Sequence, residues 1–211
     1  FDTSIAELSA DRFLSIMKER LKAGAVVVGH DFALGKDRQG TPDWLSERIE
    51  TVPVAKLEID GGRVSSSALR SLISSGEVER AARLFGRKFE IEGVVVEGRQ
   101  LGRTLGFPTA NVVRASELVT PADGVYAAHC SVDENEHHCA VSIGLRPTIQ
   151  GSTGRTIEAY LLDYSGDLYG RTLRLSFVKR LRPEAKFESI ERLIAQMTLD
   201  IQSVREVLAD A

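Results

Sequence analysis

The sequence predicts an α+β protein in which an α/β segment, residues 1–87, is followed by an antiparallel sheet or closed barrel with a terminal helix, residues 88–211. Three observations lead to this prediction. Helical and strand patterns alternate up to Gly86, strand patterns alone follow it, and an apolar stripe at helical spacing closes the chain. The boundary near residues 86–89 contains no flexible linker, so we expect two segments that are closely joined.

The first segment alternates helices and strands. After Ser9, apolar side chains recur at helical spacing up to Leu21, which predicts an amphipathic helix capped by Ser9. The run Ala25–Gly29 is short, β-branched and closed by glycine, which is typical of a buried parallel strand. The remaining elements expected here are a short helix from Thr41 to Ile49, a strand from Thr51 to Ile59 that ends at a Gly61-Gly62 turn, and a helical hairpin from Ser65 to Gly86.

The second segment reads as strands almost to its end. In the last of these strands Leu173, Leu175 and Phe177 alternate with polar residues, so one face is expected to be buried and the other wet. Ser189 is expected to cap a final helix whose apolar stripe packs on the sheet. About six strands are expected, which is enough for a small barrel. Their predicted ranges are Phe89–Val96, Thr109–Val113, Val125–Val132, Cys139–Ile143, Thr156–Leu162 and Thr172–Leu181.

Composition narrows the class of protein only a little. A hydrophobic content of 43% with 27% charged residues is ordinary for a soluble protein, and no apolar run is long enough for a membrane span. A net charge of -3 gives no basic footprint, so we expect neither nucleic acid nor a membrane as a partner. Two cysteines, Cys130 and Cys139, are too few for a disulfide scaffold, which favours the cytoplasm. The oligomeric state stays open.

The segment from Gly98 to Asn111 holds the densest cluster of unusual residues, with a glycine at every fourth position and two arginines. Such a segment can bring backbone N–H groups and guanidinium groups against phosphate oxygens, although the glycines alone also fit a hairpin loop. Thr109 and Asn111 are two residues apart on a predicted strand and therefore point to the same side. Their hydroxyl and amide oxygens suit Mg²⁺ beside a nucleotide phosphate.

The stretch Gly106–Asn111, Gly-Phe-Pro-Thr-Ala-Asn, resembles the signature of riboflavin kinases, and later stretches follow in the order and spacing of that family. The resemblance covers residues 88–211. It implies a six-stranded Greek-key barrel that binds ATP under the glycine-rich segment, with Mg²⁺ held by Thr109 and Asn111 and with Glu158 as general base. The later stretches that carry the resemblance are residues 124–127, 143–148, 157–163, 166–170 and 181–187.

Glu158 is expected on the strand face opposite Ile157, Ala159 and Leu161. A primary hydroxyl that attacks a phosphoryl group needs a carboxylate to accept its proton, although by position alone Glu158 also fits a solvated surface residue. The resemblance further implies that Arg182 and Glu184 line the flavin side, whereas Arg146, next to Pro147, fits a structural role and Tyr126 fits the core. The residues implied to bind ATP are Gly98, Gly102, Arg103, Gly106, Phe107, Pro108 and Thr109.

Residues 1–87 resemble the latter part of the Rossmann-like FMN adenylyltransferase domain of bacterial bifunctional FAD synthetases, through Val28–Gly40 and Val64–Arg70. The resemblance implies a remnant nucleotide site made of Asp31, Ser66, Ser67 and Arg70, in which the serines and the arginine bind phosphate at a helix start. A plain serine cap is the alternative. The His-x-Gly-His motif of that family does not occur in these residues, so we expect a truncated product or a fragment that forms FMN but little or no FAD.

One further cluster suggests a metal site. The residues His129, Cys130, His137, His138 and Cys139 would meet across a hairpin that turns at Asp133 to Glu136. No Cys-x-x-Cys spacing is present and two of the histidines are adjacent, so we expect an ordinary surface hairpin.

Three hypotheses about function follow. The first is a riboflavin kinase that uses ATP and Mg²⁺ to make FMN. The second is a bifunctional FAD synthetase seen here as a fragment. The third is a flavin-binding module without catalysis, against which Thr109, Asn111 and Glu158 argue, because binding alone requires neither a metal pair nor a base.

Overall fold

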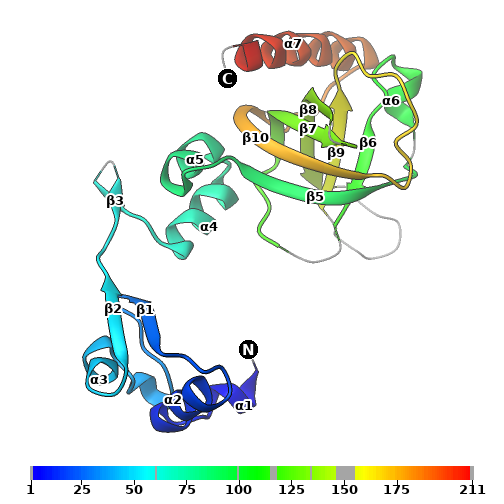
Figure 1. Ribbon diagram of the computed structural model, residues 1–211. Coiled ribbons are helices and arrows are strands. Elements are labelled where there is room, and N and C mark those ends of the chain that lie inside the picture. Colours follow the sequence, from blue (N-terminus) through cyan, green and yellow to red (C-terminus); the bar gives the residue numbers. More distant parts are fainter. Residues whose placement is uncertain are drawn as a thin grey trace. The chain divides into compact units, whose positions relative to one another are not determined.

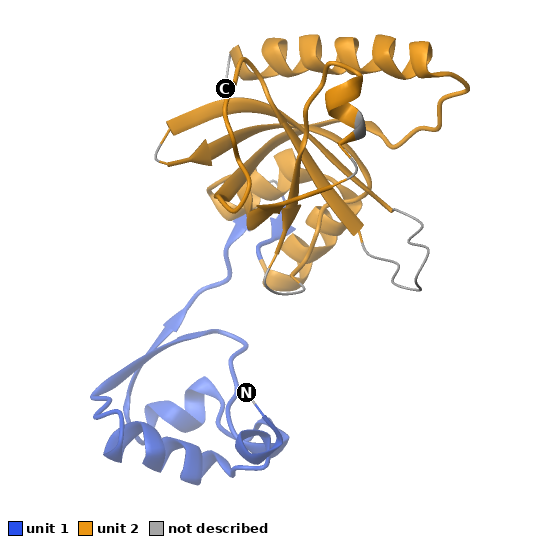
Figure 2. Ribbon diagram, turned by 90° about the vertical axis from the view of Figure 1, so that its right-hand side faces the viewer, with its two compact units in different colours: residues 1–64 blue, residues 65–211 orange. Residues whose placement is uncertain are grey.

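The computed structural model describes residues 2–59, 61–98, 100–114, 118–133, 135–145 and 155–209. The chain divides into two compact units, residues 1–64 and residues 65–211 (Figure 2). The first combines helices with a parallel strand pair, and the second is a closed six-stranded antiparallel barrel with a C-terminal helix. The predicted α+β fold is therefore confirmed.

The first unit is built around two parallel strands, β1 (Ala25–Gly29) and β2 (Glu50–Val54), which pair from Ala25 opposite Glu50 to Gly29 opposite Val54. Ser9 caps α2 (Ala10–Glu19) as predicted, because its side chain accepts a hydrogen bond from the Arg12 N–H. Thr41 caps the short α3 in the same way. The remaining elements are α1 (Thr3–Ala6), η1 (Lys36–Arg38), α3 (Pro42–Ser46), β3 (Glu58–Ile59) and β4 (Gly62–Arg63).

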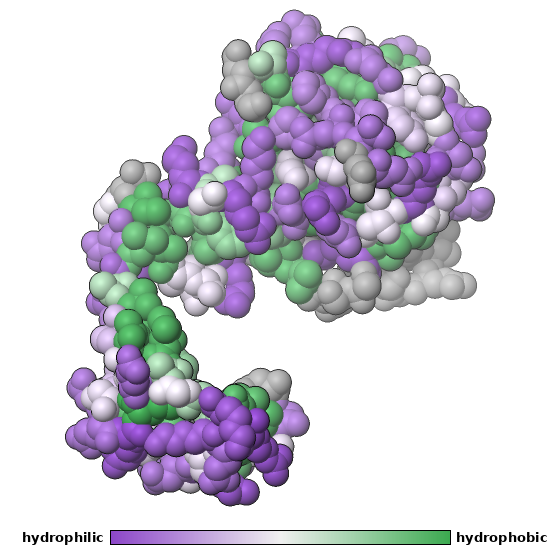
Figure 3. Space-filling model, viewed as in Figure 1, coloured by the Kyte–Doolittle hydropathy of each residue, from purple (hydrophilic) through white to green (hydrophobic). Residues whose placement is uncertain are grey.

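The strand pair of the first unit is covered on one face only. Val26 and Val28 point into a core that also holds Leu14 and Leu45 from α2 and α3. On the opposite face Val27, Val52 and Val54 are exposed, and Figure 3 shows apolar surface over this part of the unit.

The predicted strand from Thr51 to Ile59 is in fact two strands. Pairing between β1 and β2 stops at Val54, and Glu58–Ile59 forms a separate hairpin with Gly62–Arg63. Pro53, which has no backbone N–H to donate, lies just before the point where the chain leaves the parallel pair.

The helical hairpin consists of α4 (Ser66–Ser75) and α5 (Val78–Phe85), with Gly76 between them in a left-handed conformation at φ 85°. Val78 belongs to the same hydrophobic cluster as the barrel, so the hairpin packs within the second unit. The predicted domain boundary at residues 87 and 88 marks where the kinase-like sequence begins, and it stays a prediction.

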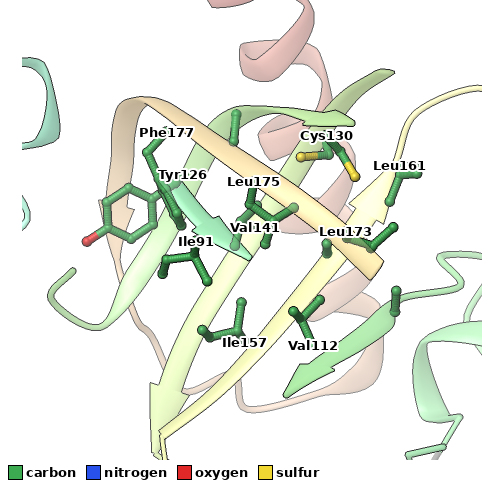
Figure 4. Packing of buried hydrophobic residues seen from close by; sticks show 14 of the residues in the cluster. Ile91, Val112, Tyr126, Cys130, Val141, Ile157, Leu161, Leu173, Leu175 and Phe177 are labelled. Carbon is green, nitrogen blue, oxygen red and sulfur yellow. The ribbon is translucent and has the colours of Figure 1, made fainter. Parts of the chain in front are cut away.

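The barrel strands run in the order β10-β5-β6-β9-β8-β7, and β7 closes the barrel on β10. β6 and β7 follow each other in the sequence but are not neighbours, because β9 and β8 lie between them in the barrel. The connection from β6 to β7 therefore crosses two strands, as in a Greek key. Alternate side chains of each strand fill the interior (Figure 4), and Tyr126 lies among them as predicted. The strands are β5 (Phe89–Val96), β6 (Ala110–Val113), β7 (Gly124–Val132), β8 (Asn135–Leu145), β9 (Arg155–Leu161) and β10 (Thr172–Pro183).

The C-terminal helix α7 (Ile190–Ala209) packs on the outside of the barrel against β7, β8 and β10 (Figure 1). Val204 and Leu208 bury Ala127 of β7, which explains why nearly all of β7 is buried on both faces. The short helix α6 (Leu101–Thr104) lies within the glycine-rich segment. Within the described part of the chain, none of the helices combines the length and the apolar character needed to cross a membrane.

Candidate active site

A cavity of about 400 Å³ lies on the outer face of the barrel, between the strands, the glycine-rich segment and the N-terminal half of α7. This volume is within the usual range for small-ligand sites. One wall is apolar, with Leu193, Met197 and Ile201 from α7. Its polar lining includes Thr109, Asn111, Ser142, Glu158, Tyr160, Arg182, Glu184 and Asp200.

The side chains of Thr109, Asn111 and Glu158 meet on this face. Asn111 of β6 lies directly opposite Glu158 of β9 in the strand register. The Thr109 hydroxyl, just before β6, donates a hydrogen bond of 3.2 Å to Glu158 Oε2. Ile157 and Ala159 point into the barrel core, so the predicted outward orientation of Glu158 is what the structure shows. A hydroxyl, an amide and a carboxylate are thereby concentrated at one edge of the cavity.

Two glycines make room for this cluster. A Cβ atom on Gly98 would lie 2.2 Å from Asn111 Nδ2, and one on Gly102 would lie 2.3 Å from the Phe107 carbonyl oxygen and 3.2 Å from Thr109 Oγ1. No side chain fits at either position without displacing its neighbours. The glycine-rich segment therefore has a steric reason for its composition at Gly98 and Gly102.

Other residues of this segment lie outside the cavity lining. Arg103, Gly106 and Pro108 are exposed, and the Phe107 ring packs edge-on against Tyr160 at 5.9 Å between centroids. Gly106, two residues after the end of α6, has φ 86°, a left-handed value that glycine adopts without strain. The structure thus brings Gly102, Thr109, Asn111 and Glu158 together, whereas the ATP-binding roles of Arg103, Gly106, Phe107 and Pro108 stay predictions.

Arg182 is held by a partner that the sequence did not reveal. Its Nε and Nη2 atoms donate to the two carboxylate oxygens of Asp200 on α7 at 2.9 and 2.7 Å, and its Nη1 atom donates to the Pro183 carbonyl at 3.1 Å. Gln196 donates to the same carboxylate at 3.0 Å. The guanidinium group therefore ties β10 to α7 at the cavity wall. Glu184, the other predicted flavin-side residue, also lines the cavity and lies over Gly144.

The position of Asp200 in the sequence does indicate that it has a buried partner. It lies three residues after Met197 and four before Val204, on the apolar stripe of the last helix. An acidic residue on such a stripe requires a buried partner. Neither Asp200 nor Gln196 belongs to the motifs of the family resemblance.

The predicted remnant nucleotide site is divided between the two units. Asp31 lies in the first unit, where an ion pair and hydrogen bond with Arg63 lower the pKa of its carboxyl group. Ser66, Ser67 and Arg70 are exposed residues of α4 in the second unit. The residue that caps α4 is Ser65, whose hydroxyl accepts from the Ala68 N–H at 3.2 Å. A nucleotide role for these residues stays a prediction.

The histidine and cysteine cluster is divided between the two faces of the barrel wall. Cys130 and Cys139 are buried in the barrel core, where burial raises the pKa of the Cys139 thiol well above its usual value. His129 and His138 pair on the outer face with 5.5 Å between ring centroids. Among the described residues no group of three potential ligands is placed to hold a metal ion. Arg146 and Pro147 lie outside the described residues.

The fold and the cavity define a class: a small Greek-key barrel with a cavity of small-ligand size on its outer face, beside oxygen donors and a carboxylate. A family model described as riboflavin kinase matches residues 85–208, and one described as FAD synthetase matches residues 1–68. The chain belongs to the riboflavin kinase family. Both resemblances noted in the motifs are thereby confirmed.

Two relatives align with almost the whole chain. The bifunctional riboflavin kinase/FMN adenylyltransferase of Pseudomonas fluorescens is 37% identical over 215 residues, which cover 99% of this chain and 69% of the relative. The protein of the same name from Listeria monocytogenes is 34% identical over 213 residues, with 99% and 68% covered. This chain therefore spans about two thirds of the length of these bifunctional proteins.

A solved structure has the same fold. It is described as a macrolide-efflux protein from Streptococcus pneumoniae, with a TM-score of 0.89 and 31% identity over 97% of this chain and 67% of that one. This likeness supports the fold.

Proposed function

We propose that the barrel unit transfers the γ-phosphate of ATP to the ribityl 5′-hydroxyl of riboflavin and releases FMN. The observation that carries the proposal is the meeting of Thr109, Asn111 and Glu158 at one edge of the cavity, in a chain that belongs to the riboflavin kinase family. A neutral alcohol that attacks a phosphoryl group needs orientation, a proton acceptor and compensation of the phosphate charge. The cavity has residues for each of these tasks.

Glu158 is the proton acceptor in this proposal. Its carboxylate lines the cavity, and one oxygen is oriented by the Thr109 hydroxyl. The second oxygen can accept the proton of the substrate hydroxyl while the new O–P bond forms. The proton leaves the alcohol for Glu158, and the bond between the γ-phosphorus and the bridging oxygen of ATP breaks.

Thr109 and Asn111 would hold Mg²⁺ beside the phosphates. The donor set fits a hard cation, because a hydroxyl oxygen, an amide oxygen and a neighbouring carboxylate lie together. When bound, Mg²⁺ neutralises charge on the phosphate oxygens. The absence of a Cβ atom at Gly98 leaves the Asn111 side chain the room it needs in this position.

Thr109→Ala and Asn111→Ala are each expected to raise the Mg²⁺ concentration for half-maximal activity by at least about tenfold, since each removes an oxygen ligand. Titrating Mg²⁺ at saturating riboflavin measures this. Thr172→Ala is a matched control, because Thr172 is an exposed strand threonine that does not line the cavity. Unchanged Mg²⁺ dependence in both site variants would show that the pair is structural.

The proposed function is tested by incubating the protein with riboflavin, ATP and Mg²⁺ and separating the flavins by chromatography. FMN formation that requires ATP is the expected result. Flavin binding without FMN would instead support a non-catalytic flavin-binding module and would overturn the proposal.

The same assay decides the second candidate function, FMN adenylyltransferase activity. The match of residues 1–68 to the FAD synthetase family favours this candidate. These 211 residues contain no His-x-Gly-His motif, so we expect FMN to accumulate with little or no FAD. Substantial FAD from FMN and ATP would overturn that expectation and leave the kinase assignment intact.

A further inference from the structure

A continuous row of side chains crosses the floor of the cavity. Strand register places Asn111 of β6 opposite Glu158 of β9, Glu158 opposite Ser142 of β8, and Ser142 opposite Val125 of β7. All four residues line the cavity. Directly opposite side chains on neighbouring antiparallel strands are about 5 Å apart. The floor therefore offers polar groups at three successive steps, from Asn111 through Glu158 to Ser142.

The polar groups that line the cavity differ in their hydrogen bonds. Glu158 accepts from Thr109, and at the wall Arg182 donates to Asp200. Ser142 is exposed within the cavity, and its hydroxyl has no hydrogen-bond partner among the described residues. A hydroxyl that faces a substrate cavity without a protein partner is free to bind a polar group of the substrate.

The direction of phosphoryl transfer determines which substrate group reaches Ser142. The attacking and leaving oxygens lie roughly in line across the transferred phosphorus. If the phosphates lie on the β6 side, at Thr109 and Asn111, the alcohol approaches Glu158 from the β8 side. The remainder of the substrate that carries this hydroxyl then extends over Ser142 towards the apolar wall made by Leu193 and Met197.

We propose that Ser142 binds a secondary hydroxyl of the ribityl chain and thereby positions the terminal hydroxyl at Glu158. The proposal rests on the riboflavin kinase function proposed above. A spacing of about 5 Å is one that a few carbon atoms of the ribityl chain span. Ser142 is thus a specificity-determining residue, because it distinguishes a polyhydroxylated chain from a plain alkyl alcohol that carries the same flavin ring.

The test compares two substrates in four proteins. The substrates are riboflavin and an isoalloxazine with an unbranched hydroxypentyl chain, which keeps only the terminal hydroxyl. The proteins are wild type, Ser142→Ala and the isosteric pair Ser142→Thr and Ser142→Val. The measured quantity is kcat/KM for riboflavin divided by kcat/KM for the alkyl analogue. This ratio does not depend on the fraction of folded protein, so a destabilised variant still gives an answer.

We expect this ratio to fall about threefold to tenfold in Ser142→Ala and Ser142→Val, as for the loss of one hydrogen bond, and to stay near the wild-type value in Ser142→Thr. A wild-type ratio in Ser142→Ala would overturn the proposal. An equal fall in Ser142→Thr and Ser142→Val, with no fall in Ser142→Ala, would also overturn it, since only bulk would then matter. Wild-type protein that makes no FMN would instead contradict the kinase function itself.

Discussion

Replacing Glu158 by glutamine is expected to lower kcat by about 10² to 10⁴, the usual contribution of a general base. Glutamine keeps the shape of the side chain, and its amide oxygen can still accept the Thr109 hydroxyl hydrogen bond seen at 3.2 Å. It cannot take up the proton of the ribityl hydroxyl. Riboflavin and ATP affinities should therefore change little while turnover falls.

Steady-state kinetics with both substrates distinguish this role from a binding role. A loss confined to the transition state lowers kcat and kcat/KM together, whereas lost ground-state binding raises KM at constant kcat. A loss of only about tenfold still fits, because in a loose transition state the proton leaves late. Glu92→Gln, an exposed glutamate of β5 outside the cavity, should keep wild-type kinetics. Near wild-type kcat in Glu158→Gln at saturating substrates would rule out the base assignment.

Most of the barrel was predictable because its strands have a simple period. In β9 and β10 alternate residues such as Ile157, Ala159, Leu173 and Leu175 are buried, as the sequence pattern indicates. β5 has its predicted bounds, β6, β7, β9 and β10 differ from theirs by one or two residues, and β8 begins four residues earlier than predicted, which reflects the weak signal at strand ends. Strand pairing could not be derived from the pattern, and the Greek-key order came from the family resemblance.

Short elements without periodicity were missed. The single turn of α6 lies between Gln100 and Leu105, where glycines point to a loop, and its conformation depends on close backbone contacts such as Phe107 N–H to Gly102 O at 2.8 Å. The break after Val54 was not predicted because β-branched residues, Thr51, Val52, Val54 and Ile59, lie on both sides of it. In both places the structure is a short-range backbone pairing, Phe107 to Gly102 and Glu58 to Arg63, which leaves no hydrophobic period in the sequence.

Several residues of the candidate site could be predicted from the sequence, but the contacts between their side chains could not. Thr109 and Glu158 are 49 positions apart, and only the barrel register brings them into contact. Spacing does show that Thr109 and Asn111 share a side of the chain. Ser142 carries no motif, since a serine in a strand is an ordinary surface residue until the register places it beside Glu158.

Of the interactions in the candidate site, the ion pair between Arg182 and Asp200 should contribute most to the free energy of unfolding. Asp200 is 7% exposed, and its carboxylate accepts from both Arg182 and Gln196. Asp200→Asn leaves the guanidinium group facing a neutral amide in a largely buried place, and removing one partner of a buried pair costs about 3 to 5 kcal/mol. Since the pair ties α7 to β10 beside the cavity, the KM for riboflavin should also rise.

Urea unfolding of wild type and Asp200→Asn, followed by two signals, checks this prediction. Trp44, the only tryptophan, lies in the first unit, whereas circular dichroism reports both units. The dichroism transition of the variant should move to lower urea, and the Trp44 fluorescence transition should not, because the lost pair lies in the second unit.

Asp163→Asn is the matched control. Asp163 is exposed, and its Oδ1 atom lies 2.7 Å from Nη2 of Arg205, which is on α7 like Asp200. Exposed pairs contribute little, so this variant should unfold like wild type. Equal shifts in both variants, or none in Asp200→Asn, would mean that the Arg182–Asp200 pair does not hold α7 on the barrel.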